Sequence, residues 1–62
     1  MTKLEIAERM ENLAVEMLNI AVEMEYFGGF SPWWHEHAHQ LNGAAHIARS
    51  WAEGMRAEHE ND

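Results

Sequence analysis

Apolar side chains recur along residues 3–27 at alternating intervals of four and three positions. The row consists of Ile6, Met10, Leu13, Met17, Ile20, Met24 and Phe27. This heptad spacing places the row on one face of a helix, so it predicts an α-helix over residues 3–27. Two smaller apolar sets lie beside the row: Ala7, Ala14 and Ala21, and Val15, Leu18 and Val22. One partner helix is too narrow to cover all these positions, which predicts burial on two sides.

A turn and a second helix follow the first. The glycine pair at 28–29 ends the first helix, because glycine readily adopts the left-handed backbone conformation found at helix ends. Ser31 and Pro32 suit the N-cap and the first position of a new helix, which we expect over about 32–58. Its apolar row is spaced in the same way: Trp34, Ala38, Leu41, Ala45, Ala48, Ala52 and Met55. Residues 59–62 have no apolar side chain and are predicted to fray.

The short connection makes the two helices antiparallel neighbours. The predicted fold class is all-α, with residues 1–62 forming a single domain that is an antiparallel two-helix hairpin. A chain of 62 residues without cysteine buries little surface and has no disulfide to stabilise it, so we expect homodimerisation into a four-helix arrangement. The residues expected in the core or dimer interface are Met10, Leu13, Met17, Ile20, Met24, Phe27, Trp34, Leu41, Ala45, Ala48, Trp51 and Met55.

Charge and hydropathy exclude several classes of protein. Eleven acidic residues against four basic residues give a net charge of −7, so direct binding to nucleic acid is disfavoured. No segment approaches the roughly 18 apolar residues of a membrane span, and charges interrupt the first twenty residues where a signal peptide would lie. We therefore expect a cytoplasmic protein. An acidic decoy of a nucleic-acid-binding protein is one alternative hypothesis.

The motif closest to known chemistry is His35-Glu36-His37-Ala38-His39, which satisfies the H-E-x-x-H pattern of zinc hydrolases. Residues four apart share a helix face, so His35 and His39 form a competent pair of zinc ligands, and His46 lies on the same face. Two helices, however, provide neither a substrate cleft nor a wall that stabilises an oxyanion. We predict no enzymatic activity, no catalytic residue and no cofactor, and interpret these histidines as part of a solvated stripe. A zinc-binding helical protein is the other alternative.

Five of the six aromatic residues lie within nine positions around the predicted turn: Tyr26, Phe27, Phe30, Trp33 and Trp34. Phe27 and Trp34 belong to the apolar rows and are expected in the core. Tyr26, Phe30 and Trp33 lie off the rows, and they are candidates for binding a partner protein because Trp and Tyr dominate binding energy at interfaces. The alternative is that the rings form a cap closing the end of the hairpin or of the dimer interface.

The paired apolar rows and the segment YFGGFSPWWHEHAHQLNGAAH resemble a known group of proteins. These are the very small, all-helical open-reading-frame proteins encoded in the exo–xis region of lambdoid bacteriophages, and the resemblance covers the whole chain. It implies an early-expressed regulator in the cytoplasm of the infected bacterium that biases the choice between lytic and lysogenic development. The implied partner is a host or phage protein. The family has no established active site, so no residue role is carried over.

Overall fold

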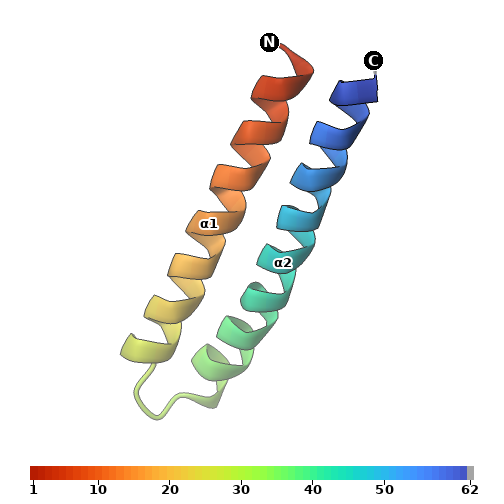
Figure 1. Cartoon of the computed structure of the whole chain (residues 1–62). Helices are drawn as coiled ribbons and strands as arrows, with labels where there is room; N and C mark the ends of the chain where they lie inside the picture. The colour runs from red at the N-terminus through yellow and green to blue at the C-terminus, as the bar shows by residue number, and fades with distance from the viewer. Residues whose placement is uncertain (62) are drawn as a thin grey trace.

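The structure, a computed structural model, describes the backbone of residues 1–61 and the side chains of residues 1–58. Helix α1 spans Lys3–Phe27 and helix α2 spans Pro32–Asn61, and the two pack side by side in opposite directions (Figure 1). The predicted all-α antiparallel hairpin is confirmed. The molecule is a rod with extents of 49 × 16 × 12 Å. The turn lies at one end, and at the other, the open end, α1 begins beside the end of α2.

Local hydrogen bonds explain where the helices begin and end. Thr2 has extended backbone angles and its Oγ1 accepts a hydrogen bond from the Glu5 amide at 3.1 Å, which caps α1. Gly29 has a φ of 58°, the left-handed conformation that favours glycine, and this residue turns the chain after α1. Ser31 Oγ accepts a hydrogen bond from the Trp34 amide at 3.4 Å, so the predicted N-cap of α2 is present.

Helix α2 continues three residues beyond its predicted end near residue 58. Residues 59–61 were expected to fray but are helical, because the chain has neither proline nor glycine after Gly54 to end the helix. Residue 62, the last of the predicted frayed tail, lies outside the described residues.

The contact between the helices consists of alanine. Seven residues of the described chain form the buried apolar core: Ala7, Ala14, Ala21, Ala38, Ala45, Ala48 and Ala52. The heptad row that begins at Ile6 does not form this contact. The alanines beside that row face α2 instead, because methyl side chains allow two helix backbones to approach more closely than Ile or Met would.

The larger apolar side chains flank this contact rather than filling it. Of the twelve residues predicted for the core or dimer interface, only Ala45 and Ala48 are buried in the single chain. The five predicted residues of intermediate exposure are Met10, Met17, Met24, Leu41 and Met55. The five that are exposed are Leu13, Ile20, Phe27, Trp34 and Trp51. Burial of these ten side chains between two copies stays a prediction.

Over the part of the chain that the structure describes, neither helix combines the length and hydropathy needed to cross a membrane.

Candidate interaction surfaces

The hairpin has two long faces of different chemistry, and the alanine contact determines which residues lie on each. Successive helical residues are about 100° apart, so the residue before each inward alanine points to one side and the residue after it to the other. Leu13 and Ile20 precede Ala14 and Ala21, whereas Val15 and Val22 follow them. The same rule in α2 places Trp51, which precedes Ala52, on the side of Leu13, and places His39 and His46 on the side of Val15.

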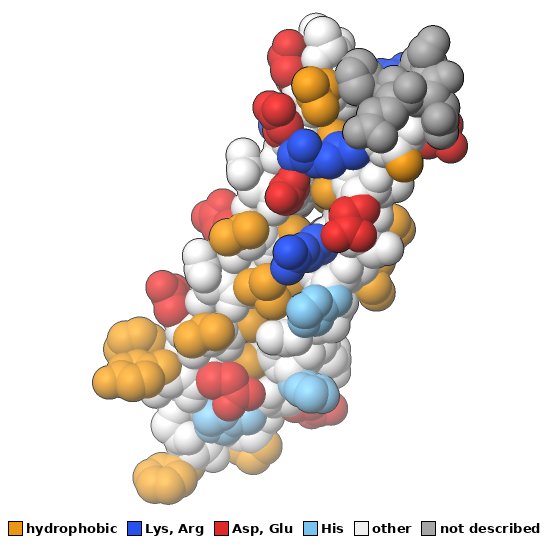
Figure 2. Space-filling model, in the orientation of Figure 1, with side chains coloured by type: hydrophobic (Ala, Val, Ile, Leu, Met, Phe, Trp, Pro, Cys, Tyr) orange, Lys and Arg blue, Asp and Glu red, His pale blue; other side chains and the backbone are white. Residues whose placement is uncertain are grey.

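The side before the alanines is the apolar face. It comprises Ile6, Met10, Leu13, Met17, Ile20, Met24 and Phe27 from α1, and Trp34, Leu41, Trp51 and Met55 from α2. The opposite side is the ionic face, which comprises Glu11, Val15, Val22 and Glu25 from α1 and His35, His39, His46, Arg49 and Arg56 from α2. Figure 2 shows acidic, basic and histidine side chains lying along one side of the hairpin, over both helices.

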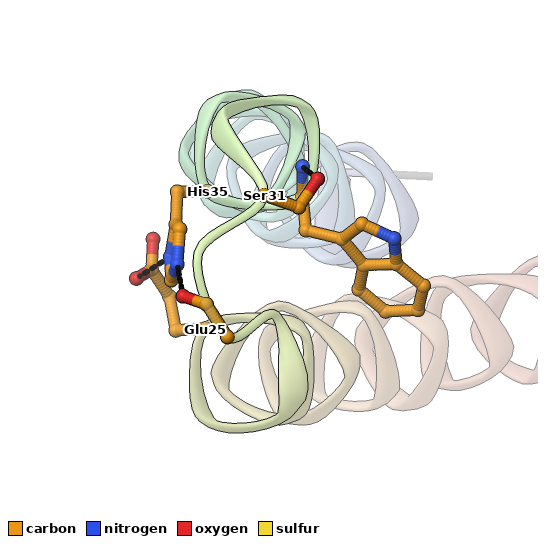
Figure 3. A network of polar contacts seen from close by, with 5 residues as sticks. Glu25, Ser31 and His35 are labelled. Atoms are coloured by element: carbon orange, nitrogen blue, oxygen red, sulfur yellow. Dashed lines mark hydrogen bonds and ion pairs between the residues drawn. The ribbon is translucent and has the colours of Figure 1, made fainter.

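Two ion pairs join the helices across the ionic face. Near the open end, Arg56 Nη2 donates a hydrogen bond to Glu11 Oε2. Near the turn, His35 lies between Glu25 of α1 and the backbone of the turn (Figure 3). All four of these side chains are more than a third exposed, so each pair adds little to stability.

His35 uses both ring nitrogens in this contact. Nδ1 lies 2.9 Å from Glu25 Oε2, and Nε2 lies 2.8 Å from the carbonyl oxygen of Gly29. Both partners are acceptors, so the protonated imidazolium, which donates from both nitrogens, fits the site best. The hydrogen bond to the Gly29 carbonyl, followed by the hydrogen bond to Glu25, raises the pKa of His35 above 6.5.

The structure does not bring the three histidines of the zinc hypothesis into one site with a further ligand. Within the described residues, no three His, Asp or Glu side chains are grouped closely enough to hold a metal ion. His35 is engaged by Glu25 and Gly29, while His39 lies beside Val22 and Asn42 in a shallow hollow of the ionic face.

Among the described residues, three hollows border the apolar face, and two of them lie toward opposite ends of the rod. The third, of about 520 Å³, is lined by Ile6, Met10 and Leu13 together with Arg9, Asn12 and Glu16 of α1. The open-end groove has a volume of about 560 Å³ and is lined by Lys3, Ile6, Ser50, Trp51, Gly54, Met55 and Glu58. The turn-end groove has a volume of about 440 Å³ and is lined by Ile20, Glu23, Met24, Phe27 and Trp34. The apolar face is therefore hollowed at both ends, with large side chains beside each hollow.

The three partner-binding candidates surround the turn and are referred to as the turn cluster: Tyr26, Phe30 and Trp33. Tyr26 is 80% exposed and Phe30 is fully exposed, so these rings do not cap the end of the single hairpin. The Trp33 ring stacks on the His37 ring with 4.0 Å between centroids and 18° between planes, and His37 Nδ1 lies 2.8 Å from the Trp33 carbonyl oxygen.

Phe27 and Trp34, which were expected in the core, are also exposed in the single chain. Both belong to the apolar rows of the sequence, but the large side chains of these rows lie beside the helix contact, which alanines form. Phe27 contacts the neighbouring Tyr26 edge-on, with 4.9 Å between ring centroids. Both rings border the turn-end groove, so they belong to the apolar face and not to the turn cluster.

The sequence argument missed the pairing of His35 with Glu25. A signal for it was present, because Glu25 lies four residues after Ala21 and His35 three residues before Ala38, which turns both toward the ionic face at the turn.

Comparisons of the chain with protein-family models, with curated proteins and with solved structures returned no match.

Proposed function

We propose that this protein is a non-enzymatic interaction protein that acts as a homodimer of helical hairpins. The observation that carries the proposal is the exposed apolar face on a hairpin whose own buried core is alanine. Large contiguous apolar surfaces on small proteins mark sites of association, because leaving them in water is unfavourable. A four-helix arrangement covers this face and gives the chain the large buried side chains that a single hairpin lacks.

The turn cluster is the surface that we assign to a different partner protein. Its side chains lie around the turn, and Tyr26 and Phe30 are the most exposed large apolar side chains of the described residues. Aromatic side chains contribute a large contact area at low conformational cost, and Trp and Tyr are enriched at binding hot spots.

The biological setting in this proposal comes from the sequence resemblance described above. The protein acts in the cytoplasm of an infected bacterium, where it binds a host or phage protein and so modulates lytic against lysogenic development. The net charge of −7 makes a protein partner more favourable than direct contact with nucleic acid.

A pull-down from bacterial lysate tests the turn cluster. The bait is the wild-type protein, compared with Tyr26→Ala, Phe30→Ala and Trp33→Ala variants and with Ile47→Ala as the matched control. Ile47 is a large, exposed apolar residue of α2 that lies outside the turn cluster. We expect a defined protein that the wild type and Ile47→Ala retain and that at least one turn variant loses at least tenfold. Equal capture by all variants contradicts the assigned surface.

Sedimentation equilibrium of the same samples tests the dimer independently of any partner. We expect a mass of two chains for the wild type and for each turn variant, with and without a metal chelator. A monomer at all concentrations up to 100-fold above the assay concentration would refute the homodimer.

A further inference from the structure

We infer that the occupant of the apolar face is a second copy of this chain stacked in the opposite direction, so that the turn of one hairpin lies over the open end of the other. This inference rests on the proposed homodimer and adds its geometry. In this arrangement α1 lies against α1 of the partner copy and α2 against α2.

The first argument is the amount of apolar burial that the chain needs. Every buried apolar side chain in the described residues is alanine, which contributes little hydrophobic stabilisation compared with Leu, Ile or Trp. The large apolar side chains of the two heptad rows lie on one face, together with Trp51. A second copy presents an equally long row of the same kind, so it covers the face along its whole length.

The second argument is the difference in shape between the two ends of the apolar face. Phe27 and Trp34 project at the turn end, where they are 74% and 44% exposed. The larger groove lies at the open end, where Gly54 lacks a side chain and a Cβ built there would meet nothing within 4 Å. Opposite stacking places the rings of each copy over the larger groove of the other, whereas stacking in the same direction sets rings against rings and groove against groove.

The third argument is the charge at the helix ends. The last turn of α1 has no basic residue of its own and the first turn of α2 has no acidic residue, so a further cation at the first end and an anion at the second are favourable. The open-end groove is bordered by Lys3 of α1 and Glu58 of α2. Opposite stacking brings Lys3 to the C-terminal end of the partner's α1 and Glu58 to the N-terminal end of its α2, and both placements are favourable.

Cysteine crosslinking tests the direction of stacking, because the natural chain contains no cysteine and each variant therefore has one thiol. Ile6→Cys mixed with Phe27→Cys reports opposite stacking, since these residues occupy opposite ends of the same row on α1. Ile6→Cys mixed with Met55→Cys reports stacking in the same direction, since these residues lie at the same end on different helices. We expect at least a fivefold excess of crosslinked dimer from the first mixture under mild oxidation.

A second pair avoids removing apolar side chains from the interface. Lys3→Cys mixed with Glu23→Cys, joined by a short bismaleimide, again reports opposite stacking, and Lys3→Cys mixed with Glu58→Cys is its control. Dominant crosslinking in either control mixture overturns the inferred direction while leaving the homodimer in place. A monomeric wild type in sedimentation equilibrium overturns the homodimer and the stacking together, so the two failures are distinguishable.

Discussion

The two long faces of the hairpin lie on opposite sides of the same alanine contact, yet they differ in what they do for the chain. The ionic face is complete within one molecule, because its carboxylates have cationic partners on the neighbouring helix at both ends. The apolar face has Leu, Ile, Phe and Trp side chains that are exposed in the single chain and Met side chains that are only partly covered. From this difference we expect the stability of the fold to depend more on covering the apolar face than on the ion pairs of the ionic face.

The sharpest test of this comparison uses two residues of equal exposure. Leu13 on the apolar face and Val15 on the other side of α1 are each 51% exposed in the single chain. We expect Leu13→Glu to lower the free energy of unfolding by roughly 3 kcal/mol or more, because association would bury an unpaired charge. Val15→Glu should change it by less than about 0.5 kcal/mol.

Urea unfolding at fixed chain concentration measures both variants, and sedimentation equilibrium reports whether Leu13→Glu is monomeric. Equal effects of the two substitutions would show that both faces are exposed to water in solution, and the comparison between them would fail.

The next largest effect concerns the contact that both faces share. Ala14 is 1% exposed between the helices, so Ala14→Leu adds volume where no space exists. We expect a loss of about 2 kcal/mol in the free energy of unfolding, because the helices must separate along part of their length. Ala57→Leu, at an exposed position of α2, is the control and should be nearly neutral. Thermal unfolding followed by circular dichroism measures both.

The ionic face should respond much less to mutation. Arg56→Gln removes the ion pair with Glu11. The side chains of Arg56 and Glu11 are 41% and 45% exposed, respectively. We expect a loss of about 0.5 kcal/mol or less at low salt, and a smaller loss at 1 M salt, where the charges are screened. A loss of several kcal/mol that persists at high salt would assign the ionic face a larger part in stability than the comparison allows.

The smallest effect we expect is a dependence of stability on pH from His35. Its pKa is raised in the folded chain, so its stabilising contribution is fully present below the unfolded pKa of 6.5 and is lost as the pH rises through the folded pKa. The melting temperature of the wild type should therefore fall relative to that of His35→Gln between pH 6 and pH 8. His39→Gln leaves the contact with Glu25 intact and should retain the pH dependence of the wild type.

The sequence was sufficient to predict the helices and the turn, because their signals are local. Gly29 and Ser31 act within a few residues of their own positions, and the heptad rows identify which side of each helix is apolar. The α2 row includes Ala38, Ala45, Ala48 and Ala52, which the structure buries between the helices.

The side of α1 that faces α2 could not be predicted in the same way. Hydrophobicity alone favours burial of the row that contains Ile6 and Leu13 rather than the row that contains Ala7 and Ala14. In the structure the alanine row is buried instead. The choice depends on how closely two backbones can approach, which is a property of the packed pair and not of either helix. The contact of His35 with Glu25 depends in turn on that packing and on the path of the turn.

The position of the turn at one tip of a rod 49 Å long has a consequence for avidity. In the proposed dimer, stacked in opposite directions, one turn cluster would lie at each tip, so the two proposed binding surfaces would be separated by about the length of the molecule. Two such surfaces cannot engage one small partner together, but they can engage two sites on an extended or oligomeric partner. The second contact is then effectively intramolecular, and weak individual contacts add up to tight attachment only where the target repeats at the matching distance.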